Sequence, residues 1–261
     1  MNQGRLRRAL NGVFPVLKPH GVTSAQLLNQ LKEKLAAEVT GILATHDIKL
    51  GHGGTLDSSA TGVLTVGVGD GCRQLKCLLH GEKSYLARCQ LGVATDTYNK
   101  RGKVVLEKQF DHITEDVLQE RLHQFEGKIK QVPPLYSALK KNGRRYSDLA
   151  QEGVNFSIEP RTVHCYKLKL QDFEPPYFTL SIVSGPGFYV RSLVNDLGLA
   201  VGSCAHVCEL QRTRQGPFSL HQSLHEDQWT LKNVINAIIK HRRVFDTYCK
   251  HYELNKKYNK W

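Results

Sequence analysis

One stretch of the chain places a single acidic side chain in a glycine-rich turn. Residues 51–64 read GHGGTLDSSATGVL, and Asp57 is the only acidic residue among them. Glycines let the backbone turn tightly and let another molecule approach it closely. The local pattern alone leaves two interpretations open. Asp57 either forms an Asx-turn or helix cap, or it presents a carboxylate at a loop that a ligand can reach.

Other reactive residue types do not gather at the spacing of a metal or cofactor site. Among seven cysteines and twelve histidines, the tightest cluster is Cys204, His206 and Cys208. This cluster lacks a CxxC pair and alternates like one face of a strand. Neither a GxxxxGK[ST] loop nor a dinucleotide-binding glycine pattern is present. We therefore expect no metal and no cofactor, and we expect the cysteines to be reduced, mostly core residues of a reducing compartment.

The stretch around Asp57 also resembles a family signature. Every defined position of the pattern G-H-x-G-x-L-D-x-x-A-x-G-x-L is matched, and this pattern is typical of the TruB family of tRNA pseudouridine synthases. The family often has proline after the aspartate, where this chain has Ser58. The resemblance implies that Asp57 is the catalytic nucleophile. It also implies that His52 fills the gap that the flipped base leaves, whereas locally His52 is a loop histidine with a nearby hydrogen bond.

Two short motifs flank this stretch and resemble further family motifs. Lys18-Pro19-x-Gly21 is similar to a K-P-x-G motif, and Lys83-x-Tyr85 is similar to a K-x-Y motif. The resemblance implies a substrate-binding role for Lys18 and a stacking role for Tyr85 on the flipped base. Taken locally, Lys18 is one more surface cation, and a tyrosine on an apolar strand face is usually part of the core.

Four residues that follow these motifs along the chain complete the expected site. Asp96 ends a segment similar to a family pattern, L-G-x-x-T-D, that contacts displaced loop nucleotides. Tyr189 and Arg191 lie in a G-x-Y-[IV]-R-[ST]-L motif, and Leu210 opens an L-x-R-T motif. The resemblance implies that Tyr189 lies near C5 of the base or packs the base, and that Leu210 lines the pocket floor. Arg191 is the candidate counter-ion of the nucleophile. Taken locally, Asp96 is a turn residue, Arg191 is a surface arginine and Leu210 is an ordinary core leucine.

Residues 128–153 differ in character from the rest of the chain, because cations and tyrosines alternate there. Such a run suits a phosphate backbone and splayed bases, although most basic runs are solvated faces. The segment beginning at Gln131 resembles the family's Q-x-P-x-x-Y-S-A-x-K stretch, which leads into an inserted RNA-binding thumb. The expected RNA-binding cations of this segment are Lys140, Lys141, Arg144 and Arg145.

Hydrophobic periodicity indicates the elements that must hold these residues. Alternation predicts strands, and apolar residues three or four positions apart predict helices. Thr23 and Gln26 form a capping box at the start of one helix. The expected strands are 13–17, 63–68, 84–93, 162–170 and 177–183, and the expected helices begin near 24, 75, 114, 190 and 231. The resemblance implies an α+β fold with a mainly antiparallel central sheet, flanking helices and the inserted thumb.

Length and charge narrow the function further. The 261 residues allow one large domain or a division into two, and no apolar run approaches the length of a membrane helix. The net charge of +12 favours a polyanionic partner, nucleic acid above all. The resemblance implies a catalytic domain over residues 12–218, and we expect residues 219–261 to form a C-terminal helix and basic tail without a PUA domain.

These observations predict a tRNA pseudouridine synthase that acts on the T-loop uridine at position 55. The expected partner is the tRNA T-stem-loop, with T-loop-like messenger RNAs as further candidates and no obligatory protein partner. Two rivals remain open: a non-catalytic tRNA-binding protein and a guide-RNA-dependent synthase of the Cbf5 type. The nucleus or cytosol is the expected location, ahead of the mitochondrion.

Overall fold

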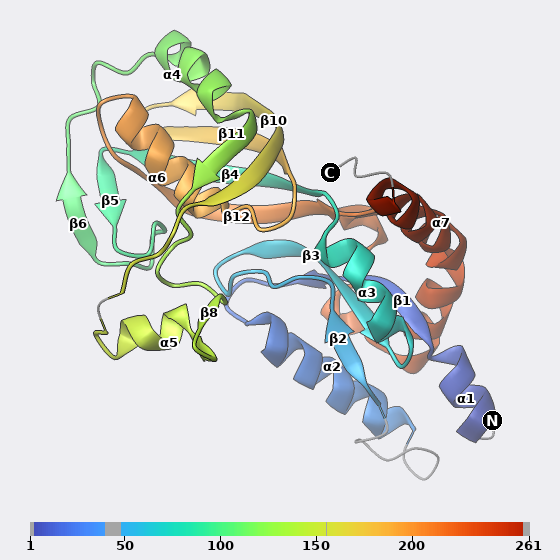
Figure 1. Cartoon of the computed structure of the whole chain (residues 1–261). Helices are drawn as coiled ribbons and strands as arrows, with labels where there is room; N and C mark the ends of the chain where they lie inside the picture. The colour runs from blue at the N-terminus through green and yellow to red at the C-terminus, as the bar shows by residue number, and fades with distance from the viewer. Residues whose placement is uncertain (1–2, 40–47, 155, 258–261) are drawn as a thin grey trace. The chain divides into compact units, whose positions relative to one another are not determined.

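The computed structural model describes residues 3–39, 48–154 and 156–257, except for the side chains of Arg145 and Asn255. The chain divides into two compact units, one formed by Met1–Lys83 with Gln211–Trp261 and the other by Ser84–Leu210. Both units combine helices with mainly antiparallel strands (Figure 1). This arrangement confirms the expected α+β class, while the expected domain boundaries stay a prediction.

Strand β3 (Thr61–Val68) is the centre of the first unit. It pairs antiparallel with β1 (Gly12–Lys18) from Gly12↔Val68 to Lys18↔Gly62, and antiparallel with β2 (Leu50–His52) at one end. At its other end β3 runs parallel to β12 (Ala205–Gln215), which also pairs with β13 (Phe218–Ser219). Because neighbours cover both of its faces, β3 is apolar along most of its length.

Helices cover the two faces of β1 and β3. They are α1 (Gln3–Ala9), α2 (Ser24–Glu38), α3 (Gly71–Leu79) and α7 (Leu231–Lys257). Leu27, Leu31 and Leu35 of α2 pack against one face. Leu75 and Leu78 of α3 pack with α7 residues against the other. The expected capping box is confirmed, because Thr23 Oγ1 accepts from the Gln26 N–H and Gln26 Oε1 accepts from the Thr23 N–H.

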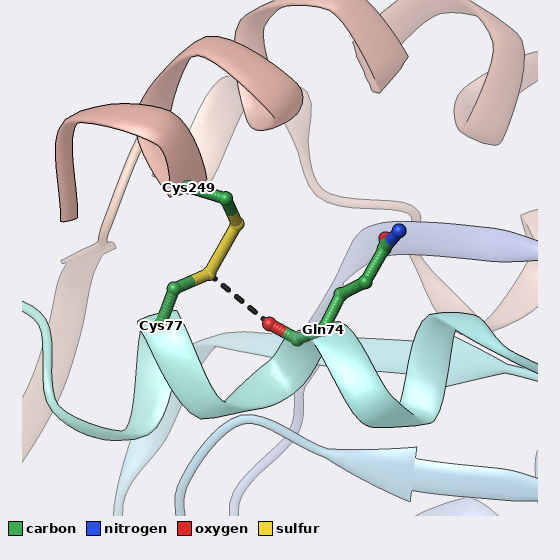
Figure 2. The surroundings of a disulfide bond; sticks show 3 residues. All are labelled: Gln74, Cys77 and Cys249. Atoms are coloured by element: carbon green, nitrogen blue, oxygen red, sulfur yellow. Dashed lines mark hydrogen bonds between the residues drawn. A yellow bond between two sulfur atoms is a disulfide. The ribbon is translucent and has the colours of Figure 1, made fainter. Parts of the chain in front are cut away.

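A disulfide joins α3 to α7 in this unit. Cys77 and Cys249 are bonded across 172 residues of sequence, and their Cα atoms lie 5.7 Å apart (Figure 2). The Sγ atom of Cys77 also lies 3.1 Å from the carbonyl oxygen of Gln74. The expectation that all seven cysteines are reduced is therefore wrong for this pair. The sequence could not show the pairing, because it depends on the packing of two distant helices.

The second unit contains a sheet in the order β12, β4 (Lys83–Leu91), β11 (Tyr177–Ser184), β10 (Arg161–Glu174) and β7 (Gly127–Gln131). Helix α4 (Glu115–Leu122) contacts β10 and helix α6 (Val190–Ala200). A short helical turn, His123–Phe125, follows α4 and completes the helix expected over 114–125. Strands β5 (Val93–Thr95) and β6 (Val104–Glu107) form a separate ribbon.

The basic segment of residues 128–153 begins inside the sheet of the second unit. Residues 128–131 belong to β7, which pairs antiparallel with β10. The chain then forms a small hairpin, β8 (Lys140–Lys141) and β9 (Arg144–Arg145), and a short helix α5 (Tyr146–Gln151). The inserted RNA-binding thumb stays a prediction.

None of the helices in the described residues is both long and apolar enough to cross a membrane.

Candidate active site

Asp57 lies in the loop that joins β2 to β3. The backbone carbonyl of Asp57 accepts from the Ala60 N–H at 3.0 Å, and strand β3 begins at Thr61. No helix follows in this described stretch, so the helix-cap interpretation of Asp57 is wrong. The side chain of Asp57 is half-buried. The loop therefore turns tightly just after the carboxylate and leads straight into the central strand.

Hydrogen bonds hold the residues on both sides of Asp57. Ser24, the first residue of α2, accepts from the Leu56 N–H at 3.0 Å through its hydroxyl oxygen and lies 3.2 Å from the Leu56 carbonyl. On the other side, the carbonyl of Ser58 accepts from the Gly21 N–H at 2.8 Å. The backbone at Asp57 is thus fixed by the start of α2 and by the turn before it.

Lys18 belongs to this support and is fully buried. Its Nζ atom donates to the carbonyls of Pro19 and Val22, both at 2.8 Å, and to that of Ser58 at 3.4 Å. The local interpretation of Lys18 as a surface cation is wrong. Its expected contact with RNA stays a prediction, and the geometry favours a structural role beside the Asp57 loop.

Arg212 supports the first half of the loop and is only 1% exposed. Its guanidinium donates to the carbonyls of Val63 at 2.7 Å, Gly54 at 3.1 Å and Thr55 at 3.3 Å. Close packing against the same strand also explains Gly62, where φ is +115° and a Cβ atom would collide with the Arg212 backbone. Arg212 is the arginine of the L-x-R-T motif that Leu210 opens. Burial of an arginine next to a motif leucine is not visible in local sequence.

His52 ends β2 directly before this loop. Its Nδ1 atom accepts from the Gly54 N–H at 3.3 Å, which is the local hydrogen bond considered from the sequence. Burial, and then the nearby charge of Arg212, lower the pKa of His52 below its ordinary value. The ring is therefore neutral at pH 7, with its proton on Nε2.

Lys83 is another buried cation close to the loop. Its Nζ atom donates to the carbonyls of Leu78, Leu79 and Gly81 at 3.0, 2.8 and 2.7 Å, where α3 ends. Burial, and then the charge of Arg212, lower the pKa of Lys83 to about 7. The lysine of the K-x-Y motif therefore fastens the end of α3, and Tyr85 follows two residues later.

The remaining predicted site residues belong to the second unit. Tyr85 lies on the buried face of β4, and Leu210 is half-buried on β12. Asp96 Oδ1 accepts from the Lys103 N–H at 2.9 Å and so closes the turn between β5 and β6. Asp96 therefore has the role in a turn that the local sequence suggested. Its contact with nucleotides stays a prediction.

Tyr189 and Arg191 are held firmly at the start of α6. The Gln131 side-chain amide donates to the Tyr189 carbonyl at 3.0 Å and accepts from the Tyr189 N–H at 2.8 Å. Arg191 is 4% exposed, and its guanidinium donates to the carbonyls of Thr97 at 3.1 Å and Tyr136 at 3.0 Å. Arg191 is therefore not a surface residue. Its pairing with Asp57 stays a prediction.

The basic hairpin presents exposed cations. Lys140, Lys141 and Arg144 are exposed, and the side chain of Arg145 lies outside the described residues. Lys141 Nζ lies 5.5 Å from the centre of the Phe156 ring, and Arg144 forms an ion pair with Glu152. Three of the four predicted RNA-binding cations are thus on the surface, where an RNA backbone could reach them.

The Cys204, His206 and Cys208 cluster is held by contacts of its own. His206 Nδ1 lies 2.9 Å from the Val93 carbonyl, so it donates there, and Cys208 Sγ lies 3.7 Å from His206 Nε2. Across the described part of the chain, no group of three or more histidine, cysteine or acidic residues could hold a metal ion.

Fold and loop together define an α+β protein that presents a fixed carboxylate from a glycine-rich turn. The model of the TruB family pseudouridylate synthase N-terminal domain matches residues 41–190. The tRNA pseudouridylate synthase B C-terminal domain matches residues 191–252. The chain belongs to the TruB family of pseudouridylate synthases.

Relatives support this assignment over most of the chain. Pseudouridylate synthase TRUB1 of Homo sapiens is 49% identical over 88% of this chain and 68% of its own length. The tRNA pseudouridine synthase B of Pseudomonas aeruginosa is 39% identical over 84% of this chain and 69% of its own length.

Solved structures share the fold. A Cbf5–Nop10–Gar1 complex matches with a TM-score of 0.64 and 29% identity over 85% of this chain and 55% of that one. An archaeal box H/ACA Nop10–Cbf5 complex matches with a TM-score of 0.59 and 26% identity over 87% of this chain and 54% of that one. This chain thus spans about half the length of these two solved chains.

Proposed function

We propose that this protein is a tRNA pseudouridine synthase that isomerises the T-loop uridine at position 55. The observation that carries the proposal is the support of Asp57: in a chain of this family, Ser24 and Lys18 fix the backbone on either side of the one acidic residue in the signature loop. A fixed carboxylate suits covalent catalysis, because it loses little freedom when it attacks.

The reaction moves one bond and leaves the atom count of the nucleoside unchanged. The target base first leaves the RNA stack, which costs a few kcal/mol. Stacking on Tyr85 offsets about 1–3 kcal/mol of that cost. The carboxylate of Asp57 then attacks either C6 of the base or C1′ of the sugar, and the N1–C1′ bond breaks. The uracil rotates, C5 bonds to C1′, C5 loses its proton, and N1 gains one as Asp57 leaves.

Other residues bind and orient the nucleotide in this scheme. Neutral His52 fills the gap left by the base, and Arg191 balances the charge of ionised Asp57. Tyr189 lies near C5 or packs the base, Leu210 forms the pocket floor, and Asp96 contacts the displaced nucleotides. The basic hairpin holds the RNA backbone, and no cofactor takes part.

A direct experiment separates this proposal from its rivals. Purified protein is incubated with unmodified tRNA transcript, and pseudouridine is mapped at base resolution. We expect modification at position 55 without added RNA or protein. Binding without product would favour a tRNA-binding protein, and product that depends on a guide RNA and partner proteins would favour the Cbf5 type, whose structures share this fold.

The Asp57→Asn variant tests the nucleophile in the same assay. The amide keeps the shape of the side chain but cannot act as a carboxylate nucleophile, so product should fall below detection while tRNA affinity stays within about twofold. Turnover near the wild-type rate would remove Asp57 from the mechanism.

The proposal also covers the cellular location of the protein and its substrates other than tRNA. We place the protein in the nucleus or cytosol, where T-loop-like messenger RNAs are further candidate substrates. Mapping of messenger RNA in cells with and without the protein tests the substrates, and imaging of the tagged full chain tests the location.

A further inference from the structure

Gln215 occupies an unusual place in the strand pairing beside the catalytic loop. The β2–β3 ladder runs Leu50↔Val68, Gly51↔Gly67 and His52↔Val66, so Gly53 and Thr65 would form the next pair. Half of that pair exists, because the Gly53 N–H donates to the Thr65 carbonyl at 2.9 Å. In a regular antiparallel ladder the Thr65 N–H would donate back to the Gly53 carbonyl.

The side-chain amide of Gln215 lies between the Thr65 N–H and the Gly53 carbonyl and bonds to both. Its Oε1 atom accepts from the Thr65 N–H at 3.0 Å, and its Nε2 atom donates to the Gly53 carbonyl at 2.6 Å. Gln215 is fully buried, so water does not reach these groups. The amide therefore satisfies both backbone groups, in place of the direct bond between them.

The loop that carries Asp57 starts where this ladder ends. The next two carbonyls along the chain, those of Gly54 and Thr55, are taken by Arg212 from the same strand β12. Three successive carbonyls thus face side chains of β12. Only glycine fits at position 53, because a Cβ atom there would overlap Thr65 Oγ1 and lie 3.0 Å from Leu78 Cβ.

We propose that Gln215 is a positioning residue of the catalytic loop: its amide ends the β2–β3 ladder and thereby sets where Asp57 is presented. This inference rests on the proposed function, in which Asp57 is the nucleophile. Gln215 itself does not touch the reacting atoms in this scheme. It acts through the backbone of Gly53, four residues before Asp57.

The Gln215→Glu variant tests the amide with almost no change in shape. An ionised carboxylate still accepts from the Thr65 N–H but cannot donate to the Gly53 carbonyl, whereas a protonated carboxyl group can do both. Burial disfavours the ionised form and moves its titration towards neutral pH. At saturating tRNA, we expect the single-turnover rate to be about tenfold below wild type at pH 8 and within about threefold at pH 5.5, because one lost donor costs on the order of 1–2 kcal/mol.

Controls separate positioning from general destabilisation. Gln30→Glu makes the same chemical change on an exposed residue of α2 and should leave the rate unchanged at both pH values. Circular dichroism at the assay temperature checks that each variant is folded, and tRNA affinity should stay within about twofold of wild type. Gln215→Met removes both hydrogen bonds without adding a buried charge, so its rate should fall at both pH values with no recovery in acid.

A readout independent of activity uses backbone hydrogen exchange. In Gln215→Met, exchange across residues 53–57 should become faster than in wild type, while exchange in α2 stays unchanged. Wild-type rates in both folded variants, or losses in Gln215→Glu that are equal at pH 8 and pH 5.5, would overturn the inference. An inactive wild-type protein would instead reject the proposed function, and unchanged exchange in Gln215→Met would then reject the positioning role as well.

Discussion

At the scale of single residues, the buried cations of the first unit share one kind of partner. Lys18, Lys83 and Arg212 each donate to three backbone carbonyls. A buried cation is costly unless hydrogen bonds satisfy it, and carbonyls of irregular backbone need donors in turn. Lys83 therefore satisfies carbonyls at the end of α3, whereas Lys18 and Arg212 fix backbone at the two ends of the Asp57 loop.

Replacement of Lys18 separates support of the loop from contact with RNA. Lys18→Met leaves the carbonyls of Pro19 and Val22 without their donor, so the free energy of unfolding should fall by about 2–4 kcal/mol. Urea unfolding measures this loss, and Lys76→Met on the exposed side of α3 is the matched control. A weaker salt dependence of tRNA binding, with stability unchanged, would instead assign Lys18 to the RNA backbone.

Replacement of Arg191 tests its predicted pairing with Asp57. Loss of the counter-ion favours the protonated, inactive form of a carboxyl group, so the single-turnover rate of Arg191→Met should fall at least tenfold and partly recover as pH rises. Arg191→Lys should be impaired less, because an ammonium keeps the charge but cannot reproduce a bidentate contact.

The control for this prediction is Arg161→Met, an exposed position on β10. An Arg191→Met enzyme with the wild-type rate and pH profile would show that Arg191 does not keep Asp57 ionised. A defect confined to tRNA affinity would place Arg191 on the RNA.

At the scale of elements, the basic hairpin β8–β9 is the part most directly suited to RNA. Replacing Lys140, Lys141, Arg144 and Arg145 with alanine should weaken tRNA binding and flatten its salt dependence, because fewer counterions are released. Each lost phosphate contact should reduce the slope of log affinity against log salt by about 0.7–0.9. The single-turnover rate at saturating tRNA should change much less.

A matched pair of double variants sharpens this test. Lys140→Ala with Lys141→Ala is compared with Lys167→Ala and Lys169→Ala, two exposed lysines of β10 in the same unit. Equal effects of the two pairs on affinity would mean that only net charge matters. No effect of the hairpin pair would make these cations a solvated face.

Elements with clear periodicity could be predicted from the sequence, and short ones could not. Strands β1, β10 and β11 and helices α2 and α6 follow their patterns, because each buries one regular face. Strand β2 has only three residues, which is too short for a pattern. The β8–β9 hairpin depends on Asn142 and Gly143, both with positive φ of 51° and 84°, as a type I′ turn requires. Its flanking residues are charged, so the usual alternating signal is missing.

Candidate site residues could be predicted from the sequence where they lie in a family motif. Residues that distant packing brings to the loop could not. Family motifs predict site roles for Asp57 and Tyr85, and these roles stay predictions. The support of the loop could not be predicted, since Gln215 lies 150 residues from Thr65 and Arg212 lies 158 from Gly54. Lys18 and Arg191 were in motifs, but their burial depends on tertiary structure. Local sequence favours the surface for such charged residues, so it gives no sign of their burial.

At the scale of the whole molecule, the predicted site residues are divided between the two units. Asp57, His52 and Lys18 belong to one, and Tyr85, Asp96, Tyr189 and Arg191 belong to the other. The chain passes between them at residues 83–84 and 210–211. Neither unit alone therefore contains both the predicted nucleophile and the predicted stacking residue, and we expect each to be inactive without the other.

The Cys77–Cys249 disulfide gives the final prediction, which concerns the stability of the chain. It closes 172 residues of sequence and fastens α7 to α3 within the first unit (Figure 2). A bond across so long a stretch restricts the unfolded chain, so reduction should lower the free energy of unfolding by about 2–5 kcal/mol. Urea unfolding with and without a reductant measures the difference, and the double variant Cys77→Ser with Cys249→Ser should not respond to the reductant.

Cys72→Ser, which alters a half-buried free thiol, should respond as wild type does. Thiol titration of the denatured, unreduced protein should find the five free cysteines, Cys72, Cys89, Cys165, Cys204 and Cys208. Seven reactive thiols, together with unfolding that is indifferent to reductant, would show that the two helices are held by packing alone.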